Sequence, residues 1–206
     1  MKTMKIRITL TEQMLGTSCA NKDVHKEYIA SKSSEAKKVE EELAALPAEE
    51  LENKAKTVFP RMPNGKTPFV WDYQLRGALK EALGIQCEML DCEIKVGKTK
   101  LSKYTHKRII DNFVFVTPRK IPLSNEVGED CVRPLRADTM KGERVSLATS
   151  ETVPAGTTME FEIALLAGND AFVNLIRECL NYGALKGLGS WRNSGMGRYT
   201  WEEIAK

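Results

Sequence analysis

Residues 183–201 (GALKGLGSWRNSGMGRYTW) constrain this chain more than any other stretch of its sequence. Two glycine pairs, Gly187 with Gly189 and Gly195 with Gly197, are separated by five residues. Glycine reaches backbone angles that are closed to other residues and lets a second backbone come close. Any fold assigned to the chain must therefore accommodate a glycine-rich loop between the last predicted helix and the last predicted strand.

The other side chains of this loop give it the chemistry of a polyanion site. Lys186, Arg192 and Arg198 are positively charged with no acidic residue between them, and successive free N–H groups can point at phosphate oxygens. Trp191 offers a flat face for base stacking, which contributes about 1–3 kcal/mol per base. We predict that the loop binds a nucleic-acid backbone through Lys186, Gly187, Gly189, Trp191, Arg192, Gly195, Gly197 and Arg198. The alternative is a tight helix-to-strand connection that needs glycine only for steric reasons.

Hydrophobic periodicity predicts the first half of the fold. Residues 4–10 alternate apolar and polar, which is typical of a half-buried strand. Residues 72–83 carry apolar side chains at helical spacing, with Asp72 as a plausible N-cap and Gly84 as a plausible stop. We expect a strand at residues 112–116 and irregular structure at residues 118–141.

The last third of the chain reads as strand, helix, glycine loop and strand. Short strands are expected near residues 145–148 and 159–166, and a helix that begins at Asn169 or Asp170 and ends at Gly183. A final strand follows at residues 198–204. Together with the first strand and helix, this order predicts one α+β domain with a ferredoxin-like sheet of the RNA-recognition-motif type.

Two segments of opposite charge interrupt this pattern, although the net charge is only +3. The stretch from Glu35 to Glu52 holds seven acidic residues, and we predict a charged helical insertion at about residues 33–58. The stretch from Lys95 to Arg108 holds six basic residues and no acidic one, and we predict a basic loop or hairpin at about residues 93–108. Its candidate RNA-binding residues are Lys100, Lys103, Lys107 and Arg108, and a solvated basic loop is the alternative.

Several function classes are disfavoured by composition. No apolar run reaches the roughly 18 residues of a membrane span, and the N-terminal residues lack the layout of a secretion signal, so we expect no membrane partner and a cytoplasmic location. The cysteines lie at positions 19, 87, 92, 131 and 179, without a second pair at zinc-site spacing. We expect reduced thiols, no metal and no cofactor.

The glycine-rich loop resembles the hallmark of the RAMP superfamily of CRISPR-associated RNA-binding proteins. That hallmark is glycine, apolar, glycine, five residues, glycine, apolar, glycine, and residues 187–197 match it position for position. Residues 68–80 (PFVWDYQLRGALK) and 153–163 (VPAGTTMEFEI) are similar to segments of the type III effector backbone subunits. With the first strand, the likeness covers about half of the chain. It does not extend to the acidic and basic segments.

The resemblance implies an RNA-binding domain that holds a single-stranded, CRISPR RNA-like backbone and associates with itself or with other effector subunits. It adds Arg76 and Lys80 as RNA-contact candidates. Where family members have a small Gly-Ser-Ser turn, this chain has Trp71-Asp72-Tyr73-Gln74. In RAMP proteins the region that holds Arg133, Arg136 and Arg144 contacts RNA or a neighbouring subunit, and surface arginines without such a role are the alternative.

Other functions stay open at this point. RNA-processing members of the family use a histidine with tyrosine and lysine as general acid and base, which makes His25, Tyr28 and Lys32 candidates for a metal-independent endoribonuclease. Backbone subunits that cut target RNA use a loop aspartate, for which Asp23 is the candidate. An amphipathic, exposed helix explains the same residues without catalysis. A virus- or prophage-borne mimic of an effector subunit, or a protein-interaction module that has lost RNA binding, are further alternatives.

Overall fold

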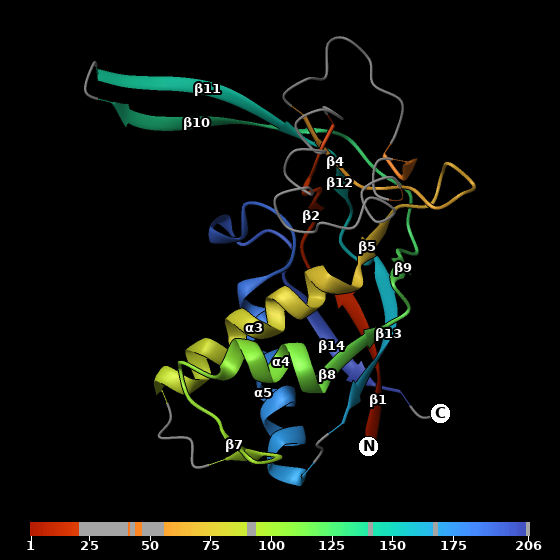
Figure 1. Cartoon of the computed structure of the whole chain (residues 1–206). Coiled ribbons are helices and arrows are strands. Elements are labelled where there is room, and N and C mark those ends of the chain that lie inside the picture. Colours follow the sequence, from red (N-terminus) through yellow and green to blue (C-terminus); the bar gives the residue numbers. More distant parts are fainter. Residues whose placement is uncertain are drawn as a thin grey trace.

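The main body of the protein is one antiparallel sheet backed by helices, from which a long two-stranded arm projects (Figure 1). The computed structural model describes residues 1–20, 41, 44–46, 56–89, 94–139, 142–166 and 169–204. The sheet consists, in spatial order, of β14 (Tyr199–Glu203), β1 (Lys2–Leu10), β13 (Thr158–Leu165) and β8 (Val114–Thr117). The helices are α3 (Asp72–Met89), α4 (His106–Phe113) and α5 (Asp170–Lys186), with a 3-10 turn η2 (Arg192–Ser194).

Shorter strands surround this body. They are β2 (Met14–Leu15), β3 (Ser18–Cys19), β4 (Lys56–Val58), β5 (Phe69–Trp71), β6 (Lys95–Val96), β7 (Thr99–Lys100), β9 (Lys120–Pro122) and β12 (Thr152–Val153). The arm is the hairpin of β10 (Cys131–Thr139) and β11 (Gly142–Ser150), whose base joins β4 and β3 in a second sheet.

The order of the main strands along the chain is β1, β8, β13 and β14, with helices after the first and third. Every neighbouring pair in the sheet is antiparallel. A β-α-β-β-α-β succession folded in this order is compatible with the predicted ferredoxin-like sheet. The class prediction, α+β, agrees with the structure.

The alternation of residues 4–10 determines which face of the sheet is covered. In β1, Met4, Ile6, Ile8 and Leu10 are all buried, and they share one core with apolar residues of α3 and α5. The opposite side chains of β1 lie on the open face of the sheet. Because side chains alternate along a strand, a one-residue shift would bury these polar groups, so the hydrophobic pattern determines the register.

Ion pairs connect neighbouring strands on the open face of the sheet. Arg7 donates two hydrogen bonds to Glu160 (2.7 and 2.9 Å) and one to Glu202 (3.1 Å). The hydrogen bond from Arg7 is the main reason that the pKa of Glu160 lies below its ordinary value. In the folded protein this carboxylate therefore stays ionised to a lower pH than in the unfolded chain.

We expect acid sensitivity from this site. A depressed carboxyl pKa contributes stability above the unfolded-state value of 4.5, and that contribution is lost as the pH falls through the folded-state value. Glu160→Gln should therefore narrow the difference between urea midpoints at pH 7 and pH 3. Glu162→Gln on the same strand is the control, because Glu162 forms no ion pair with a described residue. Equal pH dependence in wild type and Glu160→Gln would contradict the expectation.

Two glycines that were expected to end helices lie inside them instead. Helix α3 continues past Gly84 to Met89, and α5 continues past Gly183 to Lys186. A Cβ on Gly84 would lie 3.1 Å from the imidazole of His106, and one on Gly183 would overlap the hydroxyl of Tyr199. Both glycines allow a neighbouring element to approach closely. The predicted helix ends are therefore wrong.

Other element predictions also need correction. Residues 118–141 are not irregular, since they contain β9 and the whole of β10. The basic segment does form a hairpin, β6–β7, but its last residues are the first turn of α4. Because α4 continues to Phe113, the strand that was expected at 112–116 starts only at Val114. Most of the predicted insertion at 33–58 lies outside the described residues, but its end, Lys56–Val58, is a strand and not a helix.

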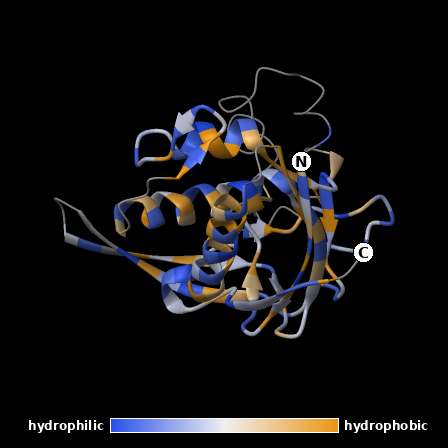
Figure 2. Cartoon of the chain, turned by 90° about the horizontal axis from the view of Figure 1, so that it is seen from below, coloured by the Kyte–Doolittle hydropathy of each residue, from blue (hydrophilic) through white to orange (hydrophobic). Residues whose placement is uncertain are grey.

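The arm is exposed on both faces over most of its length. Val132, Val145 and Leu147 are among the most exposed large hydrophobic residues, and Figure 2 shows hydrophobic stretches along the arm where it leaves the body. Within the described residues, no helix has both the length and the hydropathy to cross a membrane.

Candidate nucleic-acid interface

The glycine-rich loop lies between the C-terminal end of α5 and the start of β14, beside β2. Gly187 ends α5, and its N–H donates to the carbonyl of Gly183 (2.7 Å). The N–H of Leu188 donates to the carbonyl of Gly197 (2.9 Å), and the N–H of Gly197 donates to that of Gln13 (2.8 Å). These bonds close the loop on itself and fasten it to the segment before β2.

The glycines of the loop are required mainly for this internal packing. A Cβ at Gly187 would overlap the carbonyl of Met196, and one at Gly197 would overlap that of Leu188. A Cβ at Gly189 would lie 2.5 Å from the carbonyl oxygen of Leu15. All three also have positive φ. The steric explanation therefore accounts for these three glycines.

The expectation of free amides in the loop is wrong at three of its glycines. The N–H groups of Gly187, Gly195 and Gly197 donate to protein carbonyls, so they cannot donate to phosphate in this structure. The N–H groups of these three glycines are therefore not available to an outside anion, which makes the side chains of the loop the better candidates.

The three cations of the loop differ in their partners. Arg192 donates to Glu81 of α3 across 2.8 Å and forms an ion pair with it. Lys186 donates to the side-chain oxygen of Asn193 (3.1 Å), and Arg198 donates to the carbonyl of Leu185 (3.1 Å). Neither forms an ion pair with a described residue. Their charges are therefore available to an outside anion, whereas that of Arg192 is partly neutralised by a residue distant in sequence.

Trp191 is exposed, as expected for a stacking residue. About 38% of it remains accessible, and it precedes η2 as its N-cap residue in the left-handed conformation (φ 58°, ψ 33°). The guanidinium carbon of Arg133, from β10, lies 5.2 Å from the centroid of its ring. The loop thus touches the base of the arm at this residue.

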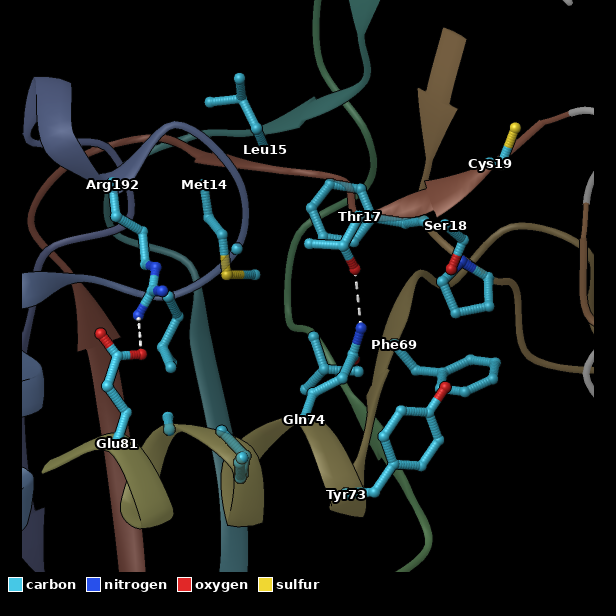
Figure 3. A pocket seen from close by; sticks show the side chains of 18 residues that line it. Met14, Leu15, Thr17, Ser18, Cys19, Phe69, Tyr73, Gln74, Glu81 and Arg192 are labelled. Atoms are coloured by element: carbon cyan, nitrogen blue, oxygen red, sulfur yellow. Dashed lines mark hydrogen bonds and ion pairs between the residues drawn. The ribbon is translucent and has the colours of Figure 1, made fainter. Parts of the chain in front are cut away.

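A cleft of about 530 Å³ opens beside the loop, between β2, β3 and α3 (Figure 3). The side chains of Gln74 and Thr17 are joined by a hydrogen bond of 2.7 Å on its wall, and the Arg192–Glu81 ion pair closes one side. Tyr73 stands on its rim. The rest of the lining is mostly apolar, which is the usual character of a ligand pocket.

The divergent Trp71-Asp72-Tyr73-Gln74 turn shapes this cleft. Trp71 is buried against Phe69 and does not line it. The side-chain oxygen of Gln74 accepts the N–H of Trp71 (2.8 Å), so Gln74 holds the start of α3. Asp72 is the first residue of the helix and not its N-cap. Bulky side chains therefore occupy the place where the resemblance predicts a small polar turn.

Arg76 and Lys80 are not brought to the glycine loop. Lys80 forms an ion pair with Asp111 of α4, and the Nε of Arg76 is buried without a hydrogen-bond partner. Neither lines the cleft. An RNA contact of these two residues on α3, apart from the loop, stays a prediction.

The basic segment forms a second cationic region at the other end of α5. Asn169, which caps the start of α5 with its side chain, also donates to the carbonyl of Lys95 in β6 (2.9 Å). The glycine loop follows the opposite end of this 17-residue helix, so α5 separates the two regions by about 25 Å at 1.5 Å per residue. Tyr104 in this region is 84% exposed, with the Nζ of Lys103 5.2 Å from its ring centroid.

The open face of the sheet has a different character. RNA-recognition motifs stack bases on aromatic residues of that face. Here Phe115 of β8 is exposed, but Glu160, Glu162 and Glu202 lie on the same face beside Lys5 and Arg7. Carboxylates repel a phosphate backbone, so this face is a poor candidate.

Four candidate catalytic residues lie outside the described residues. They are Asp23, His25, Tyr28 and Lys32. The structure therefore gives no geometry for the endoribonuclease alternative.

Comparison with known proteins connects this geometry to a fold. No family model matches the chain, and no curated protein matches it. The chain shares its fold with a chain of an RNA-bound complex. It superposes on a chain of the cryo-EM structure of the Type III-B Cmr-beta complex bound to cognate target RNA, with a TM-score of 0.51 and 10% identity. The match covers 99% of this chain and 60% of that one.

A chain of a Type IV-B CRISPR complex is also similar, with a TM-score of 0.46 and 14% identity over 100% of this chain and 91% of that one. This chain spans about 60% of the length of its Cmr-beta counterpart. The likeness is one of fold.

Proposed function

We propose that the protein binds single-stranded RNA along the face formed by the glycine-rich loop and the base of the arm, as a subunit of a CRISPR effector complex. The observation that carries the proposal is the exposed Trp191, held on a rigid loop beside Lys186 and Arg198, which no described carboxylate neutralises. A flat ring with adjacent free cations suits a base and its neighbouring phosphates. The fold shared with a subunit of an RNA-bound complex supports the same conclusion.

Salt dependence tests the electrostatic part of this proposal. For single strands, the logarithm of the binding constant falls by about 0.7 per phosphate neutralised, per logarithmic unit of salt. The double variant Lys186→Gln/Arg198→Gln should therefore reduce the slope by about 1.4 in anisotropy titrations of a labelled oligoribonucleotide. Lys66→Gln, an exposed lysine outside the loop and the cleft, is the control and should leave the slope unchanged. A slope that does not respond to the double change would exclude the loop as a phosphate site.

A subunit of a complex and a viral mimic of one make different predictions about partners. A subunit should recover CRISPR RNA together with other effector proteins or further copies of itself from its own host. A mimic should capture effector proteins of an infected host. Affinity purification followed by RNA sequencing and mass spectrometry distinguishes the two, and a protein recovered alone, with no excess absorbance at 260 nm, would contradict both.

A further inference from the structure

Arg133 is a buried cation without a described counter-ion. It lies at the base of the arm on β10 and is only 8% exposed. Its Nη1 donates to the hydroxyl of Ser150 (2.8 Å), and its Nε has no hydrogen-bond partner. A buried charge is normally paired with an opposite charge and fully hydrogen-bonded, because its desolvation is costly. Burial of this guanidinium is therefore unfavourable for the free energy of folding.

Besides the hydroxyl of Ser150, the described group that stabilises this charge is the ring of Trp191. The guanidinium carbon lies 5.2 Å from the ring centroid, in a cation–π contact. Trp191 is itself held at a cost. It is the only residue other than glycine with positive φ in the described part of the chain, and it stays 38% exposed as a whole residue. Left-handed backbone is disfavoured for residues with a Cβ. Two unfavourable features therefore meet at one contact.

Such features persist only where the surrounding structure enforces them, and they cluster at ligand-binding and active sites. The guanidinium of Arg133 lies over one face of the indole, so the opposite face is the one left for a ligand on this half-exposed residue. The guanidinium of Arg133 packs on one side of the ring, and the backbone hydrogen bonds within the loop hold the main chain of Trp191 in place. The outer face is thereby presented in one orientation.

We infer that Arg133 is a positioning residue that holds Trp191 so that an unpaired nucleobase stacks on its outer face, forming a layered arrangement of base, indole and guanidinium. The inference rests on the proposed function and specifies its ligand. Every base has a flat face, so the site accepts any of the four. A base paired within a duplex cannot be inserted, so the ligand is single-stranded.

Abasic scanning tests the contact directly. A labelled oligoribonucleotide is made as a set in which one position at a time lacks its base, and the Kd of each is divided by that of the intact strand. For wild-type protein, loss of the stacked base should weaken binding by roughly 5- to 150-fold. Trp191→Ala should bring the ratio near one at that position, and Trp191→Phe should retain most of it.

Arg133→Gln should lower the same ratio toward one, while Arg136→Gln should not change it. Arg136 is the matched control, because it is an exposed arginine on the same strand and forms an ion pair with Glu143. Arg133→Lys separates two roles. A lysine keeps the charge but cannot stack as a planar group. If Arg133 positions the ring, Arg133→Lys should therefore reduce the abasic ratio. If Arg133 acted only as a charge, Arg133→Lys would leave this ratio and the affinity for the intact strand unchanged.

A second readout needs no RNA. The fluorescence of Trp191 is obtained as the difference between the emission spectra of the wild type and Trp191→Phe. Its emission maximum should shift in Arg133→Gln, because the indole loses its contact with the guanidinium. Stability should not fall greatly, since an unpaired buried cation is removed; Arg133→Met replaces Arg133→Gln if the latter does not fold. If wild type binds no RNA, the proposed function fails. If it binds RNA but Arg133→Gln leaves both the abasic ratio and the emission unchanged, only this inference is overturned.

Discussion

Gly197→Ala is expected to destabilise the protein by about 3–5 kcal/mol, the range of severe single substitutions. The new Cβ would overlap the carbonyl of Leu188, at a backbone φ of 71° that disfavours any side chain. The loop could relieve the overlap only by giving up the bonds from Leu188 to Gly197 and from Gly197 to Gln13. Equilibrium unfolding in urea measures the loss, with the slope of the transition as a check that two-state behaviour is kept.

Gly195→Ala is the matched control for this substitution. Gly195 has a similar φ of 84°, but a Cβ there would meet only the guanidinium of Arg198, 3.6 Å away at its nearest atom. The cost should be that of the left-handed backbone alone, about 1–2 kcal/mol. Equal stability losses for the two variants would contradict the packing explanation. Loss of RNA binding with unchanged stability in Gly197→Ala would restore a direct role for this glycine.

The contrast between these glycines shows what sequence could predict about the loop. The spacing of the glycines correctly indicated an unusual backbone, because glycine marks positions where a side chain is excluded. It could not indicate what excludes the side chain. The carbonyl that faces Gly189 belongs to Leu15, 174 positions earlier in the chain. The same limit explains Gly84 and Gly183, which were expected to end helices but accommodate side chains of other elements.

The strands and helices that face the core were the most predictable part of the fold. Strand β1 and the start of α5 follow from alternation and from the cap at Asn169, whose side chain accepts the N–H of Phe172 (2.8 Å). Only a short part of the arm was predicted, the strand near residues 145–148 within β11, because most of the arm residues whose burial is described are exposed and no burial pattern is imposed on the sequence. Pro134 within β10 further conceals it, since proline is rare inside strands.

Charge was the least predictable feature of the interface. The loop contains no acidic residue, yet its Arg192 forms an ion pair with Glu81 of α3. On α3, Lys80 likewise forms an ion pair with Asp111 of α4. In contrast, Arg133 is buried and has no counter-ion among the described residues. Local sequence gives the sign of each charge, but the partner comes from the fold. Only Lys186 and Arg198 keep the free charge that was expected of the loop.

Affinity for RNA is expected to rise by roughly 10²- to 10⁴-fold once a strand is long enough to reach both cationic regions. Because the glycine loop and the basic segment lie at opposite ends of α5, about 25 Å apart, a short oligonucleotide can contact only one of them. A longer strand binds the second region as an intramolecular step, at a high effective concentration. If about five phosphates are then neutralised, the salt slope should approach about −3.5.

A length series of single-stranded RNA, with Kd measured by anisotropy at several salt concentrations, should therefore show a step and not a smooth rise. Lys100→Gln/Lys103→Gln should remove the step without weakening the shortest strands, because these lysines belong only to the basic segment. Lys186→Gln/Arg198→Gln should weaken short and long strands alike. If the basic segment is merely solvated, the lysine variant will bind every length as the wild type does. The loop would then be the sole RNA contact among the two regions, which makes this comparison the direct test of whether α5 separates two halves of one binding path.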